Sequence, residues 1–259
     1  MYLCFDQLNR LLSRYFIRLS YCGTAYNGWQ NQPHEGTITV QATIEKALST
    51  YLRSSIDMVG CGRTDTGVHA KDYYAHFDVP HDLDDIPLIV YRINKMLPGD
   101  IAVHLLIKVS DDAHARFDAL SRSYEYHIHT LKSPFLINSY YYPYRIKDFG
   151  LLQQAADLIS ETDDFTTFCK LHSDAKTMIC KITECTWTVI DDKYVFRITA
   201  DRFLRGMIRL IVGMCLNVSG GKLSIDEVRK AIQERARTGH DLSVPAVGLY
   251  LCDIRYPYL

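Results

Sequence analysis

The residue in this chain best suited to chemistry is an aspartate on a short segment punctuated by glycines. Asp65 lies within residues 60–70, which read GCGRTDTGVHA. Gly62 and Gly67 permit backbone conformations and close approaches that a Cβ hinders, and the threonine hydroxyls can fix the loop. A carboxylate held there can act as a nucleophile or as an electrostatic partner. The competing interpretation is an Asx-type turn that only closes a hairpin, which Gly and Asp alone would favour.

Two expected strands position this loop. Residues 55–59 resemble a short strand. Residues 73–79 alternate, with Tyr73, Ala75, Phe77 and Val79 on one side and polar or larger groups between them, as in a half-buried strand. Asp65 is therefore expected on the connection between two strands.

Periodicity predicts the same order of elements in each half of the chain. In the first half we expect strands over 14–20, 55–59, 73–79 and 101–109, with helices over 40–52, capped by Thr39, and 86–96. In the second half we expect strands over 123–130, 178–190, 194–200 and 248–255, with helices over 149–160, 204–218 and 225–237. This β-α-β-β-α-β order predicts an α+β fold with two ferredoxin-like halves that form a mixed sheet around a cleft. The expected divisions are an N-terminal extension (1–13), a first half (14–110) and a second half (111–259).

The motifs, taken in order along the chain, resemble one family. Within residues 60–70, residues 62–70 match the pattern G-R-T-D-x-G-V-H-A, and residues 26–32 (YNGWQNQ) match Y-x-G-W-Q-x-Q. Further similar segments follow at 97–103, 114–126, 203–213 and 248–251. Together they resemble the tRNA pseudouridine synthase A family, which modifies the anticodon stem-loop of transfer RNA. The resemblance spans residues 15–256. It implies the pseudouridine synthase fold, with Asp65 as the catalytic carboxylate in a cleft.

Charge and cysteine content restrict the class of protein. A formal net charge of -1 and a pI near 6.8 argue against coating of nucleic acid by bulk positive charge, so any RNA site must be a local patch. The eight cysteines contain no C-x-x-C pair, which favours reduced thiols in a cytosolic protein over zinc or disulfides. His127 and His129 share a strand face, a spacing more often packed or solvated than metal-bound. We expect no metal site.

No membrane segment is expected. The first dozen residues mix apolar with polar side chains, so they lack the unbroken apolar run of a signal peptide. They are read either as a short amphipathic extension or as the product of an upstream start. No later stretch approaches the roughly 18 apolar residues that a membrane span needs.

The implied reaction needs one carboxylate. Converting uridine to pseudouridine breaks the bond between N1 and C1′ and forms one between C5 and C1′, so no redox agent, metal or nucleotide cofactor is required. A hydrolytic glycosidase usually needs two carboxylates, and this loop offers only Asp65. The sequence leaves open whether Asp65 attacks the sugar, attacks the base or removes a sugar proton.

Two further residues are assigned with the help of the resemblance. Arg209 lies in the apolar stretch 207–212, where a buried guanidinium needs a partner unless it reaches water. The family's matching arginine forms a salt bridge with the catalytic aspartate, which lowers that acid's pKa. Tyr124 alone would be read as a core aromatic on a strand. The family's matching tyrosine stacks on the target base, which must leave its helix to react.

The remaining candidates are substrate contacts. By resemblance, Arg63 holds the flipped nucleotide or its phosphate, while Thr66 and His69 contact substrate or only shape the loop. Four more arginines are expected either to contact phosphates or to lie on a solvated face: Arg116, Arg122, Arg202 and Arg205.

The resulting prediction is a cytoplasmic homodimeric isomerase that forms pseudouridine at positions 38 to 40 of tRNA without a cofactor. One alternative is a synthase of the same family that acts on a different RNA. The other is an RNA-binding or RNA-folding protein without catalysis, which the presence of Asp65, Tyr124 and Arg209 disfavours.

Overall fold

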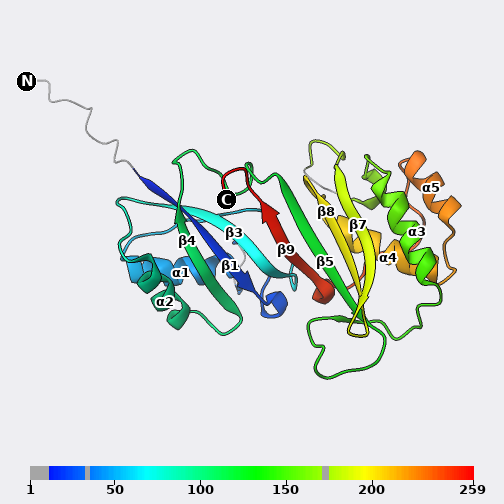
Figure 1. Ribbon diagram of the computed structural model, residues 1–259, viewed down its shortest axis with the longest axis horizontal. Coiled ribbons are helices and arrows are strands. Elements are labelled where there is room, and N and C mark those ends of the chain that lie inside the picture. The colour runs from blue at the N-terminus through cyan, green and yellow to red at the C-terminus, as the bar shows by residue number, and fades with distance from the viewer. Residues whose placement is uncertain (1–11, 33–35, 171–174) are drawn as a thin grey trace, which may run out of the picture. The chain divides into compact units, whose positions relative to one another are not determined.

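The computed structural model describes residues 12–32, 36–170 and 175–259, and the chain divides into two compact units (Figure 1). Unit 1 ends at Ala119 and includes Tyr258, and unit 2 runs from Leu120 to Pro257 and includes Leu259. Most of the predicted N-terminal extension, residues 1–11, lies outside the described residues.

Unit 1 has the predicted β-α-β-β-α-β order. Its strands are β1 (Ser13–Tyr21), β2 (Val59–Gly60), β3 (His69–Val79) and β4 (Ile101–Lys108), and its helices are α1 (Val40–Leu52) and α2 (Ile86–Met96). All strand pairs are antiparallel, in the order β4-β1-β3-β2. The first strand therefore lies between the third and the fourth, as in a split βαβ unit.

Unit 2 repeats this arrangement with additions. Its strands are β5 (Ser121–His129), β6 (Tyr140–Tyr141), β7 (Ile182–Ile190), β8 (Lys193–Ala200) and β9 (Leu249–Arg255), and its helices are α3 (Phe149–Ser160), α4 (Met207–Ser219) and α5 (Ile225–Gln233). The order β9-β5-β8-β7 is antiparallel, and β6 adds a parallel pair with β5. The fourth, first, third and second main strands thus have the same order as in unit 1. The predicted α+β class with ferredoxin-like halves and a mixed sheet is confirmed.

Three helices have the predicted bounds because each begins at a side-chain cap. The Thr39 hydroxyl accepts a hydrogen bond from the Ala42 amide at 3.2 Å, at the start of α1. Asp85 and Asp148 cap α2 and α3 in the same way, each at 3.1 Å. Such caps satisfy donors that the first helical turn leaves free.

The bounds of α4 and α5 differ from the prediction. Helix α4 begins at Met207 rather than residue 204, since its N-cap is Gly206 with φ of 74°. Helix α5 ends at Gln233 rather than residue 237, because Arg235 has the left-handed φ of 52°. A left-handed residue interrupts the helical run of hydrogen bonds.

The strand predicted over 55–59 was wrong except at its end. Side chains of α1 take the backbone groups that a ladder would use. The Gln41 side-chain amide donates to the Met58 carbonyl at 2.9 Å. The backbone amide of Met58 donates to the Glu45 carboxylate at 2.9 Å, and the backbone amide of Ile56 donates to the Ser49 hydroxyl at 3.0 Å. Only Val59 and Gly60 pair with β3. Strand β7 likewise begins at Ile182, later than predicted.

The prediction that β3 is half-buried was also wrong, because both of its faces are covered. His76 is only 5% exposed and stacks on Phe16, while the Ala115 amide donates to its Nδ1 at 3.1 Å. Burial lowers the pKa of His76 to about 4, so the ring is neutral at neutral pH. The segment after β4 thus covers a face that alternation assigned to solvent.

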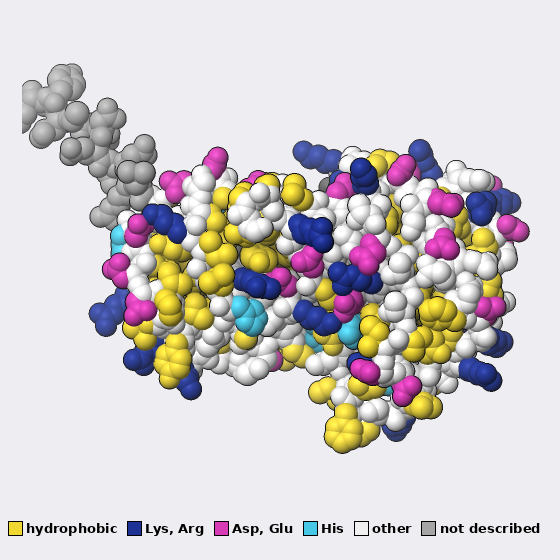
Figure 2. All heavy atoms as spheres, in the orientation of Figure 1, with side chains coloured by type: hydrophobic (Ala, Val, Ile, Leu, Met, Phe, Trp, Pro, Cys, Tyr) yellow, Lys and Arg dark blue, Asp and Glu magenta, His cyan; other side chains and the backbone are white. Residues whose placement is uncertain are grey.

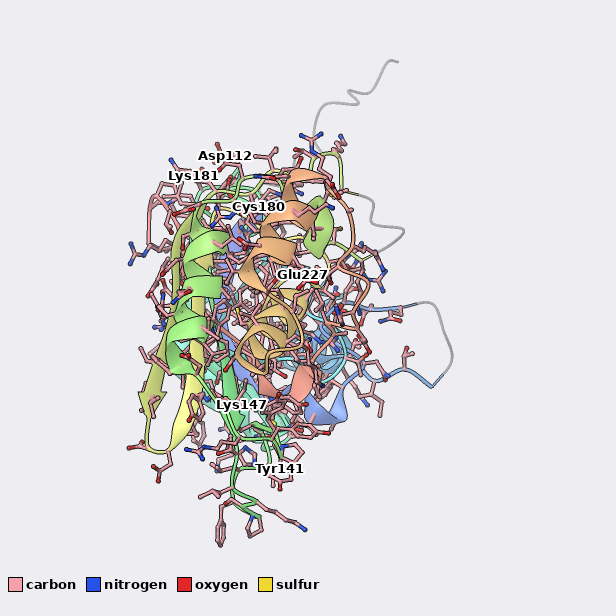
Figure 3. All side chains as sticks on the ribbon, turned by 90° about the vertical axis from the view of Figure 1, so that its right-hand side faces the viewer. Asp112, Tyr141, Lys147, Cys180, Lys181 and Glu227 are labelled. Carbon is pink, nitrogen blue, oxygen red and sulfur yellow. The ribbon has the colours of Figure 1, made fainter. Side chains whose placement is uncertain are left out.

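Each unit has its own packed core with one buried tryptophan. In unit 1, α2 packs against β4 and Trp29 lies among aromatic side chains. In unit 2, α3 packs against α4 and β7, and Trp187 lies 5.0 Å from the Phe196 ring. Figure 3 shows α3 and α5 beside the sheet of unit 2. No helix in the described ranges is long and apolar enough to cross a membrane.

Candidate active site

Asp65 lies on the connection between β2 and β3, as predicted, and is half-buried there. We call residues 61–68 the Asp65 loop. The Val68 amide donates to the Asp65 carbonyl at 3.1 Å, which closes a tight turn directly after the carboxylate. Gly67 within this turn has φ of 79°, a conformation that residues with a Cβ rarely adopt. The glycine therefore allows the chain to turn back into β3.

Three aromatic residues, which we call the aromatic support, lie against the first part of this loop: Tyr21, Trp29 and Tyr73. Each is less than 5% exposed. Trp29 stacks on Tyr73 at 4.0 Å, and Tyr21 meets Tyr73 edge-on at 5.6 Å. The Tyr73 hydroxyl donates to the Gly62 carbonyl, and the Tyr21 hydroxyl lies 2.8 Å from that of Thr64. Buried side chains thus hold two loop positions before Asp65.

The segment from Gly23 to Trp29 packs directly on the backbone of the loop. The Trp29 amide donates to the Thr64 carbonyl at 3.3 Å. Gly28 has φ of 91°, and a Cβ on it would lie 2.4 Å from that same carbonyl oxygen. A Cβ on Gly23 would lie 1.9 Å from the Val68 carbonyl oxygen. Since backbone meets backbone at both points, these positions require glycine.

The same contacts explain why three of the sequence motifs occur together. Tyr26, in the motif at 26–32, accepts a hydrogen bond from the Gly67 amide through its carbonyl at 3.4 Å. Its hydroxyl donates to Asp100, in the motif at 97–103, at 2.7 Å. Burial and this hydrogen bond raise the pKa of Tyr26, so its hydroxyl remains a donor. The motifs at 26–32, 60–70 and 97–103 therefore form one connected structure around Asp65.

The predicted substrate contacts of unit 1 lie in different environments. Arg63 and Thr66 are exposed beside Asp65, and Arg63 donates to the Gln30 side chain. His69 is only 1% exposed, and its Nδ1 accepts from the Gly23 amide at 3.1 Å, a position that favours loop architecture. Arg116 is exposed, with its guanidinium 5.7 Å from the Phe117 ring centre.

In unit 2, Arg209 lies in the first turn of α4. Its Nε donates to the Val244 carbonyl at 2.6 Å, and its Nη2 lies 3.4 Å from the Ser243 hydroxyl. The guanidinium thus has backbone and hydroxyl partners within its own unit. The salt bridge with Asp65 that the resemblance implies stays a prediction.

Tyr124 lies on β5 and is 9% exposed. Its ring meets Phe203 edge-on at 5.2 Å and 83°. Two residues on, the Tyr126 hydroxyl donates to the Pro245 carbonyl at 2.6 Å, and burial raises the pKa of this phenol. Tyr124 is thus held by packing at the ring, an arrangement that keeps its plane fixed.

Two of the predicted phosphate contacts of unit 2 meet around one aspartate. Arg122 donates to the Asp201 carbonyl at 3.1 Å, and the backbone amides of Arg202 and Lys181 donate to the Asp201 carboxylate at 2.7 and 2.8 Å. Figure 3 shows Lys181 near one end of this unit and Tyr141 near the other. Arg205 is exposed, just before α4. The described residues contain no group of three His, Cys, Asp or Glu side chains that could hold a metal ion.

Sequence reasoning missed the residues that fix the loop. Tyr73 was read as part of an expected strand and Tyr21 lay just beyond the end of another, and their hydroxyl contacts depend on the fold. The signal that could have found Gly28 is its place in the motif at 26–32, because a required glycine marks a close approach or a positive φ.

Comparisons with known proteins identify the family. Residues 155–257 match the family described as tRNA pseudouridine synthase. A protein of Bacteroides fragilis named tRNA pseudouridine synthase A is 46% identical over 250 residues, which are 95% of this chain and 97% of that protein. Proteins of the same name from Porphyromonas gingivalis and Bacillus subtilis are 45% and 37% identical, over 95% and 92% of this chain and 98% and 97% of theirs. The chain belongs to the tRNA pseudouridine synthase A family.

Proposed function

We propose that this chain is an isomerase that converts uridine to pseudouridine in tRNA, with Asp65 as the catalytic carboxylate. The observation that carries the proposal is the 46% identity to a protein named tRNA pseudouridine synthase A over 95% of this chain. An alignment over 95% of the chain covers both units. The local geometry supports it, because Asp65 is half-buried on a loop whose neighbouring positions are held by other segments.

The arrangement suits a reaction in which a base leaves a sugar carbon and returns through another atom. Contacts hold the loop at Gly62, Thr64 and Gly67, on both sides of Asp65. A carboxylate that moves little can stay within reach of the sugar and base throughout the rearrangement. Each possible role of Asp65 requires the ionised form. The proposed role of Arg209 is to stabilise that form.

The proposed target is the anticodon stem-loop, at positions 38 to 40. A uridine in a stem must rotate out of its stack, and an aromatic ring recovers part of the cost. Tyr124 is the proposed ring, and its fixed packing against Phe203 supports this role. Arg63, exposed and two residues from Asp65, suits a contact with the rotated nucleotide or its phosphate.

Site-resolved pseudouridine mapping tests the function. Purified protein is incubated with unmodified tRNA transcripts, beside the Asp65→Asn variant, which keeps the shape of the side chain and removes its charge. We expect pseudouridine at positions 38 to 40 with the wild type, none with the variant, and tRNA affinity within about twofold. Turnover by the variant, after deamidation to Asp is excluded, contradicts the role of Asp65. Pseudouridine only in another RNA supports the alternative synthase, and binding without any product supports an RNA-binding protein.

The phosphate contacts are proposed for Arg202 and Arg122, which lie close together because the Arg202 amide and the Arg122 side chain both bind Asp201. Each such contact contributes a log-log salt slope of about 0.7 to 0.9. Binding titrations at several salt concentrations are expected to show a slope flattened by roughly one contact in Arg202→Ala, equally for all substrate tRNAs. An unaltered slope removes Arg202 from the assignment. The same titration of Arg63, Arg116 and Arg205 variants tests the others.

A homodimer is also proposed, supported by an apolar loop that we call the projecting loop, residues 130–139. It extends beyond the end of β5 in Figure 1, and Figure 2 shows hydrophobic side chains gathered there. Leu131, Phe135 and Ile137 are 77%, 90% and 73% exposed. Apolar surface of this kind marks an interaction site. Light scattering is expected to give a dimer that Phe135→Asp weakens, and a monomeric wild type contradicts the proposal. The proposed location, the cytoplasm, is tested by cell fractionation.

A further inference from the structure

We propose that the hydroxyls of Tyr73 and Tyr21 are positioning groups that set the place of Asp65 for catalysis. The inference rests on the proposed function of Asp65 and concerns two residues that act through the Asp65 loop.

The loop needs support because its strand pairing stops early. Strand β2 pairs with β3 only at Val59 and Gly60. The Cys61 amide then donates to the Tyr74 carbonyl at 2.8 Å. At the next residue, the partner changes from backbone to side chain, since the Gly62 carbonyl accepts from the Tyr73 hydroxyl. Tyr73 therefore takes over where the ladder ends, three residues before Asp65.

The Tyr73 ring is confined on several sides. It is 0% exposed, stacks on Trp29 at 4.0 Å and meets Tyr21 edge-on at 5.6 Å. A Cβ on Gly60 would lie 2.2 Å from the Tyr73 hydroxyl oxygen and 2.4 Å from Trp29 Nε1. A ring packed this closely has no room for another rotamer. Its hydroxyl therefore fixes the position of the Gly62 carbonyl, to which it donates.

Tyr21 supplies a second fixed point closer to Asp65. Its hydroxyl lies 2.8 Å from that of Thr64, and both side chains are buried. The Thr64 carbonyl meanwhile accepts from the Trp29 amide at 3.3 Å. The residue directly before Asp65 is thus held through its side chain and its backbone, so the direction in which the next side chain leaves the loop is restricted.

Loss of either hydroxyl has a specific expected consequence. Removing a buried donor leaves its former acceptor unsatisfied, and the loop shifts to recover a partner. A displacement near 1 Å at a catalytic group can lower a rate by about 100-fold, even when the substrate still binds. Other residues proposed to contact RNA, such as Arg202 and Arg205, belong to unit 2 and lie outside this loop.

The test compares Tyr73→Phe and Tyr21→Phe with Tyr15→Phe. Tyr15 is a matched control because it is 3% exposed on β1 and its hydroxyl accepts from the Leu83 amide at 2.9 Å, outside the loop. We expect Tyr73→Phe and Tyr21→Phe to lower the single-turnover rate about tenfold each, with tRNA affinity within about twofold and the pH profile unchanged. Tyr15→Phe should lose comparable thermal stability and keep its rate.

Each outcome has a distinct meaning. Wild-type rates in both Tyr73→Phe and Tyr21→Phe, or an equal rate loss in Tyr15→Phe, overturn the inference. The assays are run below the measured unfolding temperature of every folded variant, and if one of the two variants fails to fold, a wild-type rate in the other alone overturns the inference. An inactive wild type instead contradicts the proposed function, so the two failures are distinguishable.

Discussion

The connection between the second and third main strands has opposite forms in the two units. In unit 2, β7 and β8 form eight residue pairs and are joined by Asp191 and Asp192, whose φ angles are 47° and 61°. In unit 1, β2 and β3 form two pairs and are joined by the Asp65 loop. The same place in the fold is a tight hairpin in one unit and the carrier of Asp65 in the other.

The difference lies in where the backbone finds its hydrogen bonds. The hairpin satisfies its polar groups by strand pairing, which continues almost to the turn. The loop satisfies its polar groups outside any ladder: the Gly62 carbonyl accepts from the Tyr73 hydroxyl, the Thr64 carbonyl accepts from the Trp29 amide, and the Gly67 amide donates to the Tyr26 carbonyl. We therefore expect substitutions around the loop to change activity more than stability. Substitutions in the hairpin should do the reverse.

The largest effect is expected for Gly28→Ala. The new Cβ would lie 2.4 Å from the Thr64 carbonyl oxygen at a φ of 91°. We expect turnover to fall more than about 100-fold, because the backbone next to Asp65 must move. Gly221→Ala is the control, since Gly221 has a φ of 73° with open space around it. It should lose only about 1 kcal/mol of stability, measured by denaturant unfolding, with normal turnover. Equal activity in Gly28→Ala and Gly221→Ala would contradict the expectation that substitutions around the loop mainly affect activity.

A smaller but still large effect is expected for Arg209→Lys in unit 2. Lysine keeps the charge and loses the planar fork that binds the Val244 carbonyl and can orient a carboxylate. Turnover should fall by about 30-fold, with a changed pH profile if this arginine stabilises ionised Asp65. The pH dependence of single-turnover rates measures this. A changed rate with an unaltered profile assigns Arg209 to the fold of unit 2 alone.

Two substitutions at Tyr124 should distinguish the contribution of its ring from that of its hydroxyl. We expect Tyr124→Phe to stay within about threefold of the wild-type rate and Tyr124→Ala to lose about tenfold or more, because stacking on a base needs the ring. Rates and tRNA affinities of both variants are compared with those of Phe203→Leu, which removes the ring packed on Tyr124 at 5.2 Å. An equal loss in Tyr124→Phe and Tyr124→Ala assigns the role to the hydroxyl.

The smallest effect on activity is expected for the hairpin of unit 2. Replacing Asp191 by Asn and Asp192 by Gly supplies the residues that a turn with two positive φ angles favours. Stability should rise by about 0.5 to 1 kcal/mol, with turnover unchanged. Thermal unfolding and a rate assay measure both. Lower turnover would show that this hairpin, like the loop of unit 1, takes part in function.

Local signals predicted much of the fold. The helices at 40–52, 86–96 and 149–160 were predicted without error because Thr39, Asp85 and Asp148 cap them from adjacent positions. The strand over 55–59 was mispredicted because its backbone partners, Gln41 and Glu45, come from a helix earlier in the chain. Contacts between distant segments leave no periodic signal.

The candidate site was predictable only in part for the same reason. Glycine spacing predicted the loop that carries Asp65, since glycine requirements are local. The hydroxyl of Tyr73 was missed, because an alternating strand predicts that a side chain is buried and not which carbonyl its polar end meets. His69 was assigned to substrate or loop, and its burial against the Gly23 amide favours the loop.

Because each unit has its own core with one tryptophan, tryptophan fluorescence can follow the two units separately. The chain has two tryptophans, Trp29 in unit 1 and Trp187 in unit 2, which are 2% and 4% exposed. Replacing one by phenylalanine leaves an emission signal from the other unit alone. Because Trp29 stacks on Tyr73, its fluorescence also responds to the residues that support the Asp65 loop. Comparing the two single-tryptophan proteins during denaturation therefore reveals whether the halves melt together or in succession.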